Sequence, residues 1–290
     1  MRHAHKMKYF LGIALAAAIV LPGAAVFAQA DSNNAPNPYR LEEGWAKTAM
    51  GRNFGSTIGI TPDADGKSIW TFDRCGGNDC ANSKIAPIQK FDASGKLVMS
   101  FGAGMFNYPH GLYVDREGNV WVSDNRGTPP KDGKPGKGHT VWKFSPEGKV
   151  LMTLGTPGVA GTGQNEFNAP SDIMVAANGD IFVADRANNR IQIFDQEGKF
   201  LTEWKQFGRP SGIFIDKKDM IYVADSQSSD KLNPGYKQGI RVGSVKDGKV
   251  ASFIEETKDF GSLEGTAADD AGNVYAGYTG AMNFKRFTKK

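Results

Sequence analysis

The sequence predicts an all-β fold, a ring of repeated four-stranded sheets known as a β-propeller. The first reason is a phrase at residues 107–124 that recurs in altered form from Ala169, Arg209 and Leu263. The second is the alternation of apolar and polar residues within each copy, with β-branched and aromatic side chains that favour strands. The third is a repeat period of roughly 40 residues, which is typical of propeller blades.

Five repeat units can be aligned, and each is expected to form one blade. They cover residues 56–102, 108–155, 169–204, 209–254 and 262 to the C-terminus. Within a unit, turns such as 115–118 and 145–148 place glycine where a positive φ is needed. The last unit ends after its third strand, at residues 283–287, so its fourth strand has to come from elsewhere. We expect residues 44–48, near the start of the mature chain, to supply that strand and to close the ring.

The N-terminal 30 residues have the pattern of a bacterial-type secretory signal peptide. Three cations precede an apolar run over residues 9–20, and Ala28-Gln29-Ala30 resembles a cleavage site. The alternative is a membrane anchor, but the run falls short of the ~20 residues that span a bilayer. We therefore expect a periplasmic or secreted protein, without a stable membrane span after cleavage, in which residues 31–43 are a flexible lead-in and residues 44–290 the propeller domain.

The charge balance gives no sign of nucleic-acid binding. The formal net charge is +4, and removal of residues 1–30 takes away three cations and no acids, which leaves +1. No stripe of Lys and Arg remains in the mature chain, so we expect no nucleic-acid partner. About 260 residues can bury a large core as one domain, and we expect a monomer.

The chain has two cysteines, Cys75 and Cys80, which flank a short turn with two glycines. In an oxidising compartment such a close pair is most simply a disulfide, which would hold the neighbouring Arg74 in place. A free pair or a metal site is the alternative, although a metal site would call for more thiols nearby.

Three polar insertions lengthen the connections between strands, at residues 126–139, 156–168 and 227–239. Long loops on a rigid scaffold often carry binding sites, so a protein or glycan ligand at these loops is one expectation. The alternative for each loop is an insertion that the surface merely tolerates.

Three segments, at residues 104–112, 190–201 and 209–216, resemble the NHL-repeat propellers, and more closely the bacterial relatives of peptidyl-α-hydroxyglycine α-amidating lyase. The resemblance covers essentially the whole mature chain. Because that family usually has six repeats, it implies that about one repeat is missing here.

The resemblance also implies a site at the mouth of the central channel. In the family, histidines hold a zinc ion beside an arginine, and an α-hydroxyglycine carbinolamide is cleaved to a peptide amide and glyoxylate. His110 matches the first histidine ligand, and Arg74 matches the arginine. The other equivalent positions depart from the pattern: Ser171, Ser211 and Glu264 in the later units, with Ser56 offered by the first unit.

The mature chain holds only two histidines, His110 and His139, so three histidine ligands cannot be assembled. Ser56, His110, Ser171, Ser211 and Glu264 are instead expected to form a polar collar around the channel. His110 and Glu264 could hold a weakly bound divalent cation, zinc or less readily calcium, although catalytic zinc sites normally have three protein ligands. The alternatives are a structural role for His110 and an ordinary ion pair for Arg74.

Three hypotheses follow for the function. The first is a lyase of the amidating type, with Arg74, His110 and Glu264 as candidate catalytic residues and a peptide-like substrate. The second is a non-catalytic periplasmic propeller that binds a partner and has lost the metal site. The third is a metal-dependent hydrolase such as a lactonase, for which Glu264 lacks an obvious Asn and Asp facing it.

Overall fold

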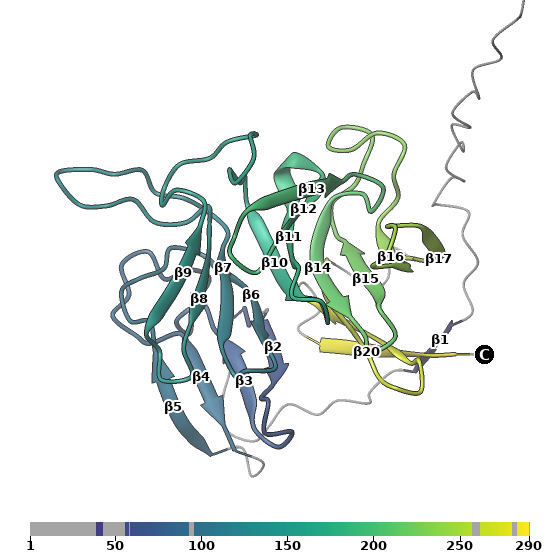
Figure 1. The fold of residues 1–290 in the computed structure, drawn as a ribbon, viewed down its shortest axis with the longest axis horizontal. Coiled ribbons are helices and arrows are strands. Elements are labelled where there is room, and N and C mark those ends of the chain that lie inside the picture. The colour runs from purple at the N-terminus through teal and green to yellow at the C-terminus, as the bar shows by residue number, and fades with distance from the viewer. Residues whose placement is uncertain are drawn as a thin grey trace, which may run out of the picture.

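A computed structural model of the chain describes residues 39–42, 56–57, 59–92, 96–256, 262–279 and 283–289. The predicted signal peptide and the 44–48 segment lie outside these residues. Twenty strands form five separate four-stranded antiparallel sheets in the described part of the chain. The fold is therefore the five-bladed β-propeller that the repeats predict (Figure 1).

The first four blades each use four consecutive strands. Blade one contains β2 (Gly59–Pro62), β3 (Ile69–Phe72), β4 (Ile88–Phe91) and β5 (Leu97–Phe101). Blade two contains β6 (Pro109–Val114), β7 (Val120–Asp124), β8 (Thr140–Phe144) and β9 (Val150–Leu154). Blade three contains β10 (Pro170–Val175), β11 (Ile181–Asp185), β12 (Arg190–Phe194) and β13 (Phe200–Trp204), with the short 3₁₀ turn η2 (Arg186–Asn188) after β11. Blade four contains β14 (Pro210–Ile215), β15 (Met220–Asp225), β16 (Gly239–Ser244) and β17 (Val250–Glu255).

Blade five is completed by the N-terminal part of the chain. Its own strands are β18 (Leu263–Ala268), β19 (Val274–Tyr278) and β20 (Asn283–Lys289), and β1 (Tyr39–Glu42) pairs antiparallel with β20. An N-terminal strand at this position was predicted, but its location was wrong, because the strand lies at residues 39–42 rather than 44–48. A four-residue edge strand is too short to show a clear period-two pattern in the sequence.

The turns between the first two strands of a blade follow the predicted chemistry. In blade two, Gly118 has a φ of 82° and its N–H donates to the Asp115 carbonyl at 3.0 Å. The Asp115 carboxylate accepts from the N–H groups of Glu117 and Asn119 at 3.0 and 2.9 Å. An aspartate at the start and glycine at the left-handed position thus fix a tight turn.

Aspartates at the ends of the second strands bind the backbone just before the first strand of the same blade. The carboxylate of Asp124 accepts from the N–H groups of Asn107 and Tyr108, at 2.9 and 2.6 Å. Asp185 and Asp225 accept in the same way from the N–H groups of Asn168 and Arg209. These residues bind backbone amides and so hold the start of the first strand against the end of the second strand in each of these blades.

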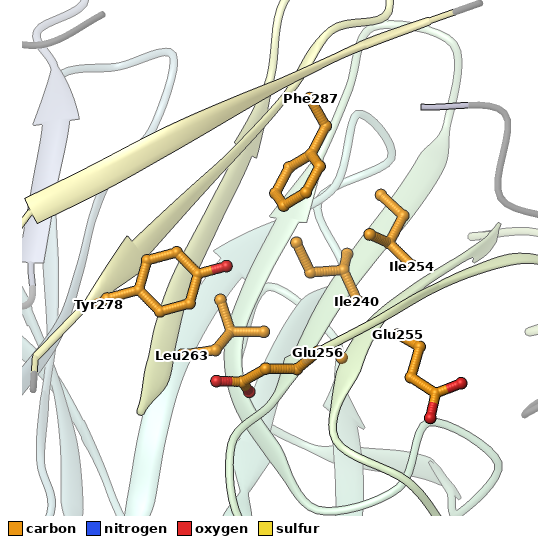
Figure 2. Close-up of a pocket in the computed structure, with 8 residues that line it drawn as sticks. Ile240, Ile254, Glu255, Glu256, Leu263, Tyr278 and Phe287 are labelled. Carbon is orange, nitrogen blue, oxygen red and sulfur yellow. The ribbon is translucent and has the colours of Figure 1, made fainter. Parts of the chain in front are cut away.

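The hydrophobic core lies between neighbouring blades. The first strands of successive blades contact one another in the order β2, β6, β10, β14 and β18. Four apolar clusters fill the four intervening seams. Figure 2 shows part of the cluster between blades four and five, where Ile240, Ile254, Leu263 and Phe287 converge and the Tyr278 hydroxyl points into the same space.

Within the described residues, no helix is long and apolar enough to cross a membrane.

Candidate functional site at the channel mouth

Equivalent positions of four first strands bring the predicted collar residues together. The strand registers show that Gly111, Asp172, Gly212 and Gly265 are equivalent positions of their blades. The residues directly before them, His110, Ser171, Ser211 and Glu264, are therefore equivalent as well. The first three side chains are almost fully buried, and 13% of the Glu264 side chain is exposed. A side chain added at Gly212 would meet the Glu264 carbonyl at 2.6 Å, so this part of the wall has no room for one.

Ser56 is not part of this collar in the structure. In blade one the register pairs Gly59 with Phe72 and so aligns Gly59, three residues after Ser56, with Gly111, which directly follows His110. The Ser56 hydroxyl instead donates to Asn78 in the disulfide turn. The position predicted from the repeat phrase is therefore out of register with the collar in blade one.

His110 is held as a neutral imidazole with one nitrogen free to accept a proton. Its Nδ1 lies 2.7 Å from the carbonyl oxygen of Ser171, so Nδ1 carries the hydrogen and donates it. Burial, followed by the charges of Arg186 and Arg74, lowers the pKa of His110 well below its usual value. Nε2 is then an acceptor, and it faces Glu264 Oε2 at 3.5 Å.

Arg186, which was not predicted from the sequence, extends from blade three to Glu264 of blade five. Its Nη1 lies 3.0 Å from Glu264 Oε2, and its Nη2 donates to Asn125 Oδ1 at 3.3 Å. Asn125 is fully buried, and its amide donates to the Ser171 hydroxyl at 3.1 Å. His110, Ser171, Asn125, Arg186 and Glu264 therefore form one circuit of contacts from blades two, three and five.

A second set of equivalent positions explains how this circuit arises. Arg74, Asn125, Arg186 and Ser226 each follow an aspartate at the end of the second strand of their blade, or directly after it in blade one: Asp73, Asp124, Asp185 and Asp225. The Ser226 hydroxyl shares a hydrogen bond with Ser211 of the collar. Asn125 and Arg186 occupy the position equivalent to Arg74, which the family motif identified. The repeat therefore contained a signal for both residues.

Arg74 lies at the entrance, between the disulfide and Tyr108. It is 5% exposed, its Nε donates to the Pro109 carbonyl at 3.0 Å, and its guanidinium carbon lies 3.7 Å from the centre of the Tyr108 ring. The guanidinium carbon of the exposed Arg126 lies 4.1 Å from the same ring centre. Burial lowers the pKa of Arg74 to about 10, so the guanidinium keeps its charge at neutral pH.

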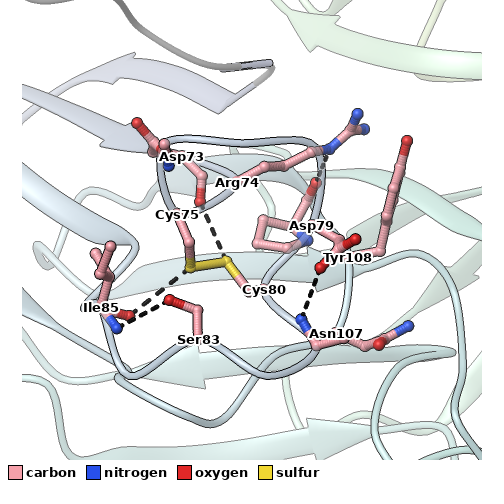
Figure 3. Close-up of a disulfide and its surroundings, with 12 residues drawn as sticks. Asp73, Arg74, Cys75, Asp79, Cys80, Ser83, Ile85, Asn107 and Tyr108 are labelled. Atoms are coloured by element: carbon pink, nitrogen blue, oxygen red, sulfur yellow. Dashed lines mark hydrogen bonds between the residues drawn. A yellow bond between two sulfur atoms is a disulfide. The ribbon is translucent and has the colours of Figure 1, made fainter.

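The predicted Cys75–Cys80 disulfide is present and fixes the turn that carries Arg74 (Figure 3). The Arg74 carbonyl accepts from the N–H of Gly77 at 2.9 Å, and the N–H of Cys80 donates to the Asn107 carbonyl at 2.9 Å. The second bond joins the turn to the residue just before Tyr108. The turn and the ring on which Arg74 stacks are thus held together.

The other predicted histidine lies away from this circuit. His139 is half-buried at the end of the 126–139 loop, and its Nδ1 accepts from the N–H of Ala169 at 3.3 Å. It links the loop of blade two to the start of blade three. Because it lies outside the circuit, His139 can serve as a control for substitutions of His110.

The residues present do not fit the zinc ion that the family resemblance implies. Among the described residues, no group of three or more His, Cys, Asp and Glu side chains could hold a metal. His110 and Glu264 provide two donors, below the three that catalytic zinc sites normally have. The oxygen of Glu264 that faces His110 is already paired with the guanidinium of Arg186, whose positive charge opposes a metal cation at the same place.

Comparison with known proteins agrees with the fold and the repeats. The NHL repeat model matches residues 106–128 and 167–194. Among solved structures, a gluconolactonase from Xanthomonas campestris aligns with a TM-score of 0.54 and 18% identity, over 81% of this chain and 72% of that chain. A chain of a nidogen/laminin complex aligns with a TM-score of 0.53 and 14% identity, over 76% of this chain and 71% of that chain. At these identities the structural likeness shows the fold alone.

The chain is therefore a five-bladed β-propeller with two segments that match the NHL repeat, and in sequence it resembles the peptidyl-α-hydroxyglycine α-amidating lyases. A probable amidating lyase of Caenorhabditis elegans is 39% identical over 62% of this chain and 55% of the relative. Amidating lyase 2 of Drosophila melanogaster is 30% identical over 60% of this chain and 42% of the relative. A mouse peptidyl-glycine alpha-amidating monooxygenase is 32% identical over 57% of this chain, which is 15% of its own length. The chain thus spans about half, or less, of these relatives.

Proposed function

We propose that this protein is an exported lyase that cleaves a small, carboxylate-terminated carbinolamide of the α-hydroxyglycine type at the channel mouth. The observation that carries the proposal is the meeting of two buried guanidinium groups, Arg74 and Arg186, with a neutral histidine whose Nε2 can accept a proton. The relatives named as amidating lyases support the same reaction class.

Arg74 and Arg186 would bind the carboxylate of the substrate. A guanidinium group matches a carboxylate through paired N–H donors, and both groups lie where little water competes. Asn125 accepts from the other nitrogen of Arg186 at 3.3 Å and so restrains the guanidinium group. This pairing would direct the carbinol carbon toward His110.

His110 would transfer the proton that the cleavage requires. Nε2 accepts the proton of the carbinol hydroxyl, the oxygen forms a double bond to carbon, and the carbon–nitrogen bond breaks with its electron pair on nitrogen. The imidazolium then returns the proton to that nitrogen, which gives a primary amide and glyoxylate without any oxidant. The imidazolium would be stabilised by the carboxylate of Glu264, 3.5 Å away. No metal enters this step, because the donor set does not fit one.

The compartment and the partners form part of the proposal. The N-terminal signal pattern supports a periplasmic or secreted location, and the disulfide is consistent with an oxidising compartment. A peptide-like substrate fits the channel mouth, and a monomer without nucleic acid as a partner fits the modest charge.

A second candidate function is a non-catalytic propeller that binds a partner. It is favoured by the rigidity of two long loops, which pack backbone against backbone beside the site. A side chain added at Gly136 would meet the carbonyl of Pro157 at 2.6 Å, and one added at Gly158 would meet the carbonyl of Thr128 at 2.5 Å. The loops are therefore one fixed surface, which suits recognition of a protein or glycan.

The deciding experiment measures glyoxylate released by the mature protein from a peptide that ends in α-hydroxyglycine. We expect release above the spontaneous rate, a loss of 100-fold or more in His110→Ala, and full activity in the matched control His139→Ala. We also expect activity to survive a chelator, with far less than one equivalent of zinc by elemental mass spectrometry. No release from the folded wild-type protein, with or without added zinc, would reject the lyase and leave the binding propeller.

A further inference from the structure

Glu264 is the one carboxylate in the collar, and it lies against a cation from another blade. The equivalent positions in blades three and four hold Ser171 and Ser211, which are small and uncharged. Glu264 reaches past blade four to Arg186 of blade three, 78 residues away in sequence, and forms an ion pair of 3.0 Å. The repeat alone does not require a carboxylate here, so its contacts call for an explanation.

The contact between Glu264 and His110 joins two acceptors. His110 Nε2 carries no hydrogen, because Nδ1 donates to Ser171, and Glu264 Oε2 accepts from Arg186. At 3.5 Å the two atoms face each other without a donor between them. A ligand hydroxyl at this place would supply the missing donor, which a structural ion pair would not need.

Positive groups outnumber the carboxylate in this part of the site. Arg186 pairs with Glu264 at 3.0 Å. Burial raises the pKa of Glu264, and the positive charges of Arg186, Arg74 and Arg126 oppose that rise. Arg74 and Arg186 are both nearly buried, and burial of like charges costs free energy unless an anion compensates. A second carboxylate, brought by a ligand, would be attracted to the same place.

We propose that Glu264 occupies the carboxylate position on Arg186 as an internal competitor, and that a small external carboxylate displaces it on binding. This rests on the carboxylate-binding part of the proposed function and not on the cleavage step. Glu264 then sets the affinity of the site: the ion pair keeps Arg186 aligned in the empty protein and raises the ligand concentration needed to fill it.

The test is the affinity of the mature protein for formate and for glyoxylate, measured by calorimetry in wild type and in Glu264→Gln. Glutamine keeps the shape and removes the competing charge, so we expect affinity to rise tenfold or more. Formate should also raise the thermal midpoint of Glu264→Gln more than that of wild type. Arg186→Gln, alone or combined with Glu264→Gln, should abolish binding.

The matched control is Glu203→Gln. Glu203 also pairs with an arginine, Arg190, at 2.8 Å, and both residues lie in blade three. Within the part of the chain that the structure describes, Glu203 does not contact the collar residues. The substitution should leave both affinities unchanged. Unchanged or weaker binding in folded Glu264→Gln would overturn the proposal. Should Glu264→Gln not fold, Glu264→Asp, which shortens the side chain away from Arg186, has to bind more tightly than wild type for the proposal to hold. Because binding is measured without turnover, a failed glyoxylate-release assay would reject the lyase and leave this result standing.

Discussion

The same repeat position differs in solvent exposure between two seams, the one between blades three and four and the one between blades five and one. Ile213 on β14 faces blade three and is 3% exposed, whereas Ile60, its equivalent on β2, is 68% exposed. On the second strands, Ile221 is fully buried and its equivalent Ile69 is 36% exposed. The four apolar clusters in the described residues fill the other seams, and none joins blade five to blade one.

This difference shows that a blade does not bury its own apolar face. Each repeat supplies side chains for the seam in front and the seam behind, and only a neighbour removes them from water. In the described residues, blade one lacks that neighbour on one side. The channel-mouth circuit uses blades two, three and five, so it depends on the sealed side of the propeller and on the Arg186–Glu264 pair that reaches blade five.

The largest expected effect comes from truncating the same residue type at the two seams. Ile213→Ala should destabilise the protein by about 2–5 kcal/mol, because it leaves a cavity in a filled seam. Ile60→Ala should cost less than about 1 kcal/mol, since the side chain is mostly in water already. Urea unfolding of both variants measures the difference. Equal losses would mean that the seam between blades five and one is packed in solution.

The fold followed from the sequence because each blade repeats turn and strand signals that act locally. The collar at His110, Ser171, Ser211 and Glu264 followed from the same repeat. Arg186 and Asn125 were missed because their side-chain contacts join residues 44 or more positions apart, which local patterns do not reveal. Ser56 was misplaced because the buried Gly59, and not the serine, sets the register against Phe72.

Blade one also contains the disulfide, so the stability that this covalent bond provides can be compared with the stability that its seam with blade five provides. Replacing both Cys75 and Cys80 by serine should lower the free energy of unfolding by about 2 kcal/mol, as expected for a loop this short. Because Arg74 lies on the same turn, the variant should also bind formate more weakly than wild type. Thermal and urea unfolding measure the first effect, and calorimetry the second. Unchanged binding would show that the contacts of Arg74 with Pro109 and Tyr108 suffice to hold it.

The smallest expected effect is a pH dependence of stability that comes from the buried His110. The pKa of His110 is lowered in the folded protein, so below the usual value of 6.5 the unfolded chain binds the extra proton more readily. The contribution of His110 to stability is therefore complete above pH 6.5 and is lost as pH falls from there toward the folded pKa, by at most about 1.4 kcal/mol per pH unit. His110→Asn should flatten this slope, whereas His139→Asn should change it less, because His139 is only half-buried. In a chain of residues 31–290, His110 and His139 are the two histidines, and their imidazole NMR signals should show that His110 stays neutral between pH 8 and 6. An ordinary titration of His110 near pH 6.5 would mean that water reaches His110 and that the arginine circuit is open to solvent.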